Sequence, residues 1–228
     1  MRFGLIKNWI LSFLFLFSIL DAYNISGDIR VCAIMVNFQE DDKESTTGNG
    51  QLLNNVEGID CGEYHIDPPP HNSAYFRSQL QAVDSYFSTV SYNQFGININ
   101  DSDVYPLSDV PYELGKPMSY YNPYNVTETT NTLLTDLFVA SLELAYSTDS
   151  IDYSQYDLII IFHAGIGQDF SLPFLDPTPE DIPSTFIDPE MIYDYSGNNI
   201  ISIGGHTINK GIIMPETQNH LNYDISID

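Results

Sequence analysis

The chain has 228 residues, of which 43% are hydrophobic and 13% aromatic, a composition typical of one folded domain and not of a disordered protein. It carries 31 Asp and Glu against 7 Lys and Arg, which gives a formal net charge of −24. A field of that sign repels nucleic-acid phosphates and anionic membrane surfaces, so we exclude nucleic-acid binding. The charge is compatible with cationic partners, calcium, or simply a soluble, self-repelling surface.

The N-terminus has the pattern of a targeting segment. Arg2 and Lys7 precede the apolar run Trp9–Leu20, which is too short to span a bilayer comfortably and matches the core of a signal peptide. We therefore expect residues 1–22 to be a cleaved signal peptide and the protein to be secreted or otherwise extracytoplasmic. An uncleaved anchor is the alternative. No later segment is long and apolar enough to span a membrane, so no membrane contact is expected after signal removal.

The two cysteines, Cys32 and Cys61, are open to two interpretations. A disulfide between them is natural in an oxidising compartment. However, Cys32 lies inside a strand-like run, where a free buried thiol is also ordinary. A zinc site built from Cys61, His65 and His71 is not expected, because their spacings match no standard site.

The first half of the chain predicts a strand, a loop and a helix. Ile29–Phe38 is rich in β-branched residues and almost uncharged, which predicts a buried strand, and the polar stretch Gln39–Gln51 predicts an exposed loop. The proline-rich Asp67–Asn72 cannot be helix interior, but Asn72 or Ser73 can cap a helix. The helix would carry one apolar stripe at spacings of 4, 3, 4 and 3: Phe76, Leu80, Val83, Phe87 and Val90.

The middle of the chain continues with a strand, a loop and a helix. Phe95–Asn100 alternates apolar and polar residues and predicts a half-buried strand. Tyr105–Pro123 is rich in proline and tyrosine and predicts an ordered loop. A second amphipathic helix is expected over about Asn131–Tyr146, followed by a central strand at Tyr156–Phe162.

The remaining segments complete a sheet. Ser171–Glu190 contains five prolines and predicts a long surface excursion, and Asn199–Asn209 resembles a hairpin around two glycines. Gly211–Pro215 predicts a final short strand, whose proline favours the edge of a sheet. The order of elements predicts an α/β fold: a mixed, mostly parallel twisted sheet with two main helices.

Four segments, in order, resemble a known family. They are "VCAIMVNFQEDD", "TTGNG", "YFRSQLQAVDSYFSTVSYNQFGINI" and "YDLIIIFHAGIGQD". Their order and spacing resemble the N-terminal half of the catalytic domain of immune inhibitor A-like secreted zinc metallopeptidases, which are zincins. The resemblance implies that residues 23–228 form a zincin N-terminal subdomain. It also implies a zinc cofactor and a peptide or protein substrate for the complete protein.

The zinc-binding motif of that family, His-Glu-x-x-His on a helix, is absent from this chain. Its spacing matters because two imidazoles one helical turn apart reach one zinc, while the adjacent glutamate reaches the zinc-bound water. No two of the five histidines have this spacing: His65, His71, His163, His206 and His220. We therefore expect no metal ligand and no catalytic residue in this chain. The expected fold is a zincin N-terminal subdomain that lacks the zinc helix.

Two functional hypotheses follow from these observations. The first is the N-terminal part of an exported zinc-dependent endopeptidase, an incomplete piece of a longer catalytic domain that is inactive as this chain alone. The alternative is a non-catalytic secreted or cell-surface binding module that keeps the peptidase-like fold.

Two segments are candidates for the substrate cleft. The resemblance places a strand-end loop on the floor beneath the active site, comprising His163, Gly165, Gly167 and Asp169, with His163 hydrogen-bonded to backbone. Gly165 and Gly167 lack the third glycine of a dinucleotide loop. The expected edge strand could pair with an extended peptide through Gly211, Ile212, Ile213, Met214 and Pro215.

The acidic residues of the proline-rich excursion are a calcium-site candidate, since calcium prefers several oxygen ligands. Their spacing fits no EF-hand, and a solvated acidic loop is the alternative. The residues are Asp176, Glu180, Asp181, Asp188 and Glu190.

Overall fold

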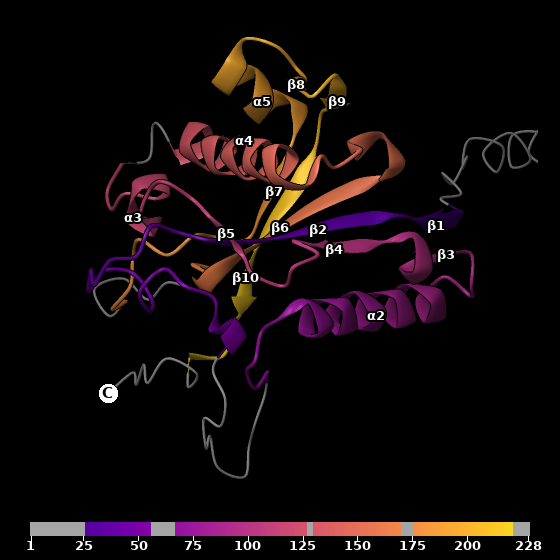
Figure 1. The fold of residues 1–228 in the computed structure, drawn as a ribbon, viewed down its shortest axis with the longest axis horizontal. Helices are drawn as coiled ribbons and strands as arrows, with labels where there is room; N and C mark the ends of the chain where they lie inside the picture. Colours follow the sequence, from indigo (N-terminus) through magenta and orange to yellow (C-terminus); the bar gives the residue numbers. More distant parts are fainter. Residues whose placement is uncertain (1–25, 56–66, 127–129, 170–175, 221–228) are drawn as a thin grey trace, which may run out of the picture.

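A computed structural model shows a mixed α/β fold with a mostly parallel sheet between helices, which confirms the expected fold class (Figure 1). Within the part of the chain it describes, no helix has the length and apolarity needed to cross a membrane. The expected signal peptide and Cys61 lie outside the described residues. The described residues are 26–55, 67–126, 130–169 and 176–220.

The main sheet has the strand order β4-β2-β6-β10-β7, and β5 pairs with the far end of β2. All neighbouring strands are parallel except β7, which runs antiparallel to β10. Every residue of β2 is buried, as expected for a strand covered on both faces. The strands are β2 (Val31–Asn37), β4 (Asp103–Tyr105), β5 (Tyr112–Glu113), β6 (Leu158–Ile166), β7 (Thr185–Ile187) and β10 (Gly211–Thr217).

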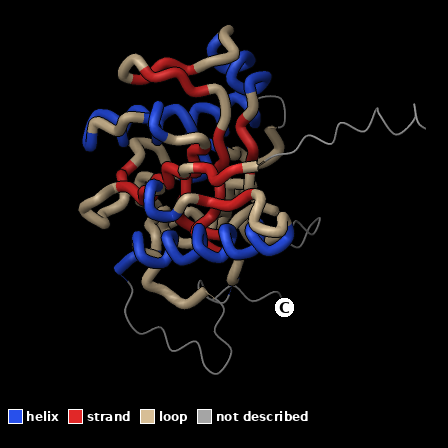
Figure 2. The backbone as a smooth tube through the Cα atoms, turned by 90° about the vertical axis from the view of Figure 1, so that its right-hand side faces the viewer, coloured by secondary structure: helices blue, strands red, loops and turns tan. Residues whose placement is uncertain are grey.

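The two long helices, α2 (Ser73–Val90) and α4 (Thr130–Asp149), lie on opposite faces of the sheet (Figures 1 and 2). On the outer side of α4 lie α5 (Pro189–Ser196) and a hairpin of β8 (Ile201–Ile203) and β9 (His206–Ile208). The shorter elements are β1 (Gly27–Ile29), β3 (Phe95–Ile97), α3 (Met118–Tyr121) and the 3-10 turns η1 (Leu53–Asn55), η2 (Ile99–Asp101) and η3 (Tyr153–Gln155).

Helix α2 begins as the sequence predicts but does not bury its whole apolar stripe. The Asn72 side chain caps it by accepting a hydrogen bond from the Tyr75 amide at 3.1 Å. Phe76 and Leu80 are buried, whereas Val83, Phe87 and Val90 are 42%, 38% and 53% exposed. The second half of α2 packs on the two-stranded sheet β1–β3, which is narrower than the main sheet. An apolar helix face is therefore left partly uncovered.

The half-buried strand predicted at Phe95–Asn100 is present, but it is shorter than expected and does not join the main sheet. Phe95–Asn100 contains only the short strand β3, which pairs in parallel with β1 and not with the main sheet. The neighbour of β2 is β4, which ends at Tyr105, where the ordered loop was expected to begin. A three-residue strand is too short to show a period of two, so its sequence carries little signal.

Gly211–Pro215 is part of a strand, as predicted, but its predicted place at the edge of the sheet was wrong. Strand β10 lies between β6 and β7, and its residues from Gly211 to Ile213 pair with Ile187 to Thr185. The described part of the proline-rich excursion supplies β7, which ends the sheet on this side among the described residues. Pro215 comes after the residues that pair with β7. Its lack of an N–H group therefore removes no hydrogen bond between β10 and β7.

Cys32 is a free, fully buried thiol on β2, so the disulfide to Cys61 is not formed in this structure. Burial, with a smaller contribution from the nearby Asp103 carboxylate, raises the pKa of Cys32 far above its ordinary value. The thiol therefore behaves as a small apolar core side chain.

Candidate functional site

An apolar groove of about 620 Å³ lies between α2 and the face of the sheet formed by β6 and β10. This volume falls within the range of typical ligand pockets, roughly 300–1,000 Å³. On the sheet, its wall is formed by Ile160, Phe162, Ile212 and Met214. The helix contributes the buried Leu80 and the partly exposed Val83 and Phe87. One end of the groove is polar.

The groove contains some of the residues that the sequence indicated as substrate contacts. Ile212, Met214, Pro215 and Asp169 all line it. Gly211 and Ile213 do not: they are buried, and Gly211 lies against Phe138 of α4 on the opposite face of the sheet. Because successive residues of a strand face opposite sides of the sheet, the predicted substrate contacts on β10 are divided between the groove and the side covered by α4.

The polar end of the groove contains Asp169, whose carboxylate accepts hydrogen bonds from the backbone and hydroxyl of Ser184 and from the amide of Gln218. Gly167 lies under this cluster, since a Cβ there would come within 2.6 Å of Asp169 and 3.0 Å of Pro215. The strand-end loop after β6 therefore contacts the end of β10.

His163 lies in the core and not in the groove. It is fully buried, and its Nδ1 donates to the carbonyl of Ala164 at 2.9 Å, the backbone contact expected from the sequence. Burial lowers its pKa to about 4, so the ring is neutral at physiological pH. Its Nε2 has no hydrogen-bond partner among the described residues. The ring cannot contact a substrate directly.

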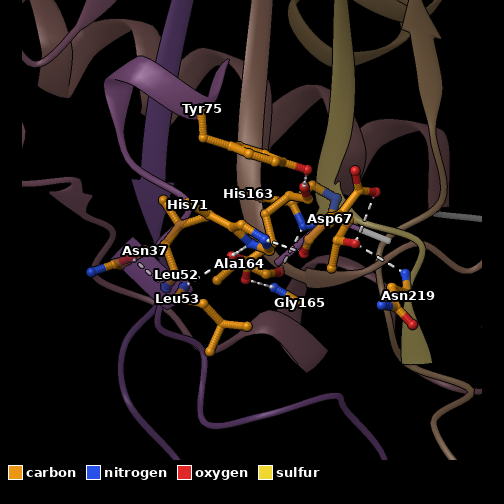
Figure 3. Close-up of polar contacts among 12 residues, drawn as sticks. Asn37, Leu52, Leu53, Asp67, His71, Tyr75, His163, Ala164, Gly165 and Asn219 are labelled. Carbon is orange, nitrogen blue, oxygen red and sulfur yellow. Dashed lines mark hydrogen bonds and ion pairs between the residues drawn. The ribbon is translucent and has the colours of Figure 1, made fainter. Parts of the chain in front are cut away.

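A second group of polar residues lies buried at the carboxyl ends of β2, β6 and β10 (Figure 3). At its centre the Nδ1 of His71 is 2.6 Å from Oε2 of Glu216, and neither side chain is exposed. The Glu216 carboxylate also accepts from the amides of Leu53 and Gly165, each at 2.9 Å. Carboxyl ends of parallel strands are the usual place for sites in such sheets.

Tyr75, in the first turn of α2, contacts both His71 and Glu216. Its ring stacks on His71 with centroids 4.3 Å apart, and its hydroxyl donates to the backbone carbonyl of Glu216 at 3.0 Å. Burial, together with the charges of Asp67 and Glu216, raises the pKa of Tyr75 well above its ordinary value. The phenol therefore stays neutral and acts as a donor.

Sequence reasoning missed the pairing of His71 with Glu216. One signal was present: Glu216 follows the apolar run Gly211–Pro215 directly, and a buried carboxylate needs a cation or several donors. With 7 Lys and Arg in the chain, a histidine was a reasonable candidate partner. Nothing in the sequence distance between the two residues indicates which histidine it is.

The acidic residues of the excursion contact protein groups in separate places. The buried Asp181 accepts from the amide of Thr47 at 2.6 Å and from its hydroxyl, and Glu180 pairs with Lys43. Asp188 caps α5 by accepting from two backbone amides. Within the described ranges, no group of three His, Cys, Asp or Glu side chains is arranged to hold a metal ion.

A comparison with known proteins found no family model that matches this chain and no significantly similar curated protein or solved structure. The functional argument therefore depends on the sequence motifs and on the geometry described above.

Proposed function

We propose that this chain is the N-terminal part of an exported zinc-dependent endopeptidase and is inactive on its own. The observation that supports the proposal is the apolar groove beside α2. In the resembled family the zinc helix follows the last strand of the subdomain, and β10 runs along one wall of the groove. An α-helix with side chains is about 10–12 Å across, and its apolar face would cover Phe162, Ile212 and Met214.

In the complete enzyme, zinc would polarise the peptide carbonyl and activate water, and its ligands would come from outside this chain. The contribution of this chain would be a wall for the substrate. The strand suited to it is β7, not β10, because β7 ends the sheet among the described residues and its Phe186 is 55% exposed. An extended peptide would pair with the outer edge of β7 by strand addition.

The test compares this chain with the product of the full reading frame. We expect a His-Glu-x-x-His motif downstream of Asp228, one zinc per extended protein, and casein hydrolysis that a chelator and a change of either motif histidine to alanine abolish. This chain alone should neither bind zinc nor hydrolyse casein. A reading frame without the motif, or chelator-sensitive proteolysis by this chain, would overturn the proposal.

A binding module is the second candidate, and the exposed apolar side chains of α2 favour it. Val83, Phe87 and Val90 together with Met214 would then contact an amphipathic segment of another protein. The two candidates differ in a simple measurement. A binding module would hold such a peptide as this chain alone and lose it in the Phe87→Lys variant, and its full reading frame would bind no zinc.

Export and calcium binding stay predictions. Mass spectrometry of the protein released by its host should find a new N-terminus between about Asp21 and Ile25, and an intact Met1 would contradict signal cleavage. Calcium binding by the acidic excursion would raise the melting temperature of the chain, which a chelator would reverse.

A further inference from the structure

We propose that His71 and Glu216 form a pH-sensitive latch, which holds the polar end of the groove in shape while the His71 ring is doubly protonated and loosens it when one proton leaves. This inference does not depend on the peptidase proposal. It concerns the same surface, because Asp67, Tyr75, Glu216 and Thr217 all line the groove at that end.

The hydrogen bonds of His71 require a cation. Its Nδ1 faces the Glu216 carboxylate at 2.6 Å, and its Nε2 faces the carbonyl oxygen of Asp67 at 2.9 Å. A carbonyl accepts hydrogen bonds and cannot donate, and an ionised carboxylate does the same. With Glu216 ionised, both ring nitrogens carry a proton in this geometry, and a neutral ring would lose one of the two contacts.

Loss of the proton would affect four segments at once. The Glu216 carboxylate joins β10 to η1 through the Leu53 amide, to β6 through the Gly165 amide, and to the segment before α2 through His71. The amide of His71 also donates to the Leu53 carbonyl at 2.9 Å. Without the imidazolium, the buried Glu216 carboxylate loses the charged partner that lies 2.6 Å away, which is unfavourable for a carboxylate with no exposed surface.

The two acidic residues that face His71 favour its charged form: Glu216 from β10 and Asp67 from the segment before α2. Tyr75, from the first turn of α2, stacks on the ring, and its own raised pKa keeps it neutral. Burial alone would lower the pKa of His71, but the hydrogen bond and charge of Glu216, with the carbonyl and charge of Asp67, outweigh it. The net result is a pKa above the ordinary value of 6.5.

The sign of the pH dependence follows from this direction. Because the folded state holds the proton more tightly than the unfolded state, the stabilisation is complete below pH 6.5 and is lost as the pH rises through the folded pKa. Three nearby groups titrate elsewhere: the pKa of His163 is lowered to about 4, and the pKa values of Cys32 and Tyr75 are raised far above the neutral range. The pKa of Asp181 is raised to about 6, so it titrates at the lower end of the window, and the His71→Gln variant described below separates its effect from that of His71.

The decisive measurement is a titration of the histidine rings by NMR in the full chain between pH 5 and 10, combined with hydrogen exchange of the Leu53 and Gly165 amides. We expect His71 to titrate above 6.5 with both ring nitrogens protonated below that point. Between pH 6.5 and the folded pKa of His71, the protection factors of the two amides should fall by up to about tenfold per pH unit, because the opened state releases one proton there, and above the folded pKa they should level off. A His71 that titrates at or below 6.5 would overturn the proposal.

A pair of variants separates the latch from general effects of pH. His71→Gln removes the titrating group, so the amides of Leu53 and Gly165 should lose the pH-dependent step. His206→Gln is the matched control, since His206 lies 3.2 Å from Asp152 in a pair with both side chains partly exposed, and the step should remain. An unchanged step in His71→Gln would refute the latch. If that variant does not fold, the wild-type titration decides alone.

Discussion

Gly211 of β10 lies against the ring of Phe138 of α4, so closely that a Cβ at this position would come within 2.3 Å of two ring carbons. The same Cβ would lie 3.2 Å from the carbonyl oxygen of Ile159 on β6. The helix therefore approaches the sheet at a point where the strand has no side chain. This close approach fixes the position of β10 between α4 on one face and the groove on the other.

Gly211→Ala should destabilise the fold. The added methyl must displace the Phe138 ring in a packed core, and overpacking of this kind costs about 1–3 kcal/mol. Gly115→Ala is the control, because a Cβ there meets no atom within 4 Å, so its effect should stay within about 0.5 kcal/mol. Urea unfolding followed by circular dichroism measures both. Equal midpoints for the two variants would show that α4 does not press on β10 in solution.

Two phenylalanines on the same stripe of α2 should differ in their effect on stability. Phe76 is fully buried and stacks on Phe162 with centroids 4.4 Å apart, so Phe76→Ala should cost about 3–5 kcal/mol. Phe87 is 38% exposed at the groove, so Phe87→Ala should cost less than half as much. Denaturant unfolding of the two variants gives the comparison. If both cost the same, some other segment covers Phe87 in solution and the groove is not open.

The contrast between these two residues also shows what the sequence could predict. The period of the stripe correctly indicates a helix and its apolar side, since both are local properties. It cannot indicate how far the sheet extends beneath the helix, which depends on the width of the β1–β3 pair. For the same reason the sequence indicates that Gly211–Pro215 is a strand but not that β7 covers it, because that pairing depends on the path of the excursion.

The candidate site was predictable to a similar extent. The strand-end loop around Gly165 and Gly167 was a candidate because an apolar run ends there, and its contact with Pro215 and Glu216 of β10 became visible only in the structure. The pair of His71 and Glu216 joins residues far apart in the sequence through tertiary packing, and no local pattern encodes that contact.

Asp181→Asn should flatten part of the pH dependence of stability. Burial raises the pKa of Asp181 to about 6, against the opposing effect of its hydrogen bonds to Thr47 and Thr178. Because the folded pKa lies above the ordinary 3.8, the protonated form is favoured on folding. This stabilisation is complete below pH 3.8 and is lost as the pH rises to about 6, by about 1–3 kcal/mol at 1.36 kcal/mol per pKa unit.

The measurement is the difference in unfolding free energy between wild type and Asp181→Asn at pH 4 and at pH 7. Asparagine keeps an oxygen for the Thr47 amide but does not titrate, so the variant should gain on the wild type as the pH rises. Asp188→Asn is the control: it lies in the same excursion and caps α5, so its cost should not reproduce this change with pH. A constant difference between wild type and Asp181→Asn would contradict the raised pKa.

The Cys32 thiol should be unreactive in the folded protein. It is fully buried on β2, and burial with the Asp103 charge raises its pKa, so neither access nor thiolate is available to a reagent. The Cys61→Ser variant leaves Cys32 as the single thiol, since the chain has two cysteines. A disulfide-exchange reagent such as Ellman's reagent should then label no thiol in buffer and one in urea. The matched Cys32→Ala variant reports on Cys61 and serves as the control. Labelling of Cys61→Ser in buffer at the rate of a free cysteine would mean that β2 is exposed, and with it the centre of the sheet that supports the groove.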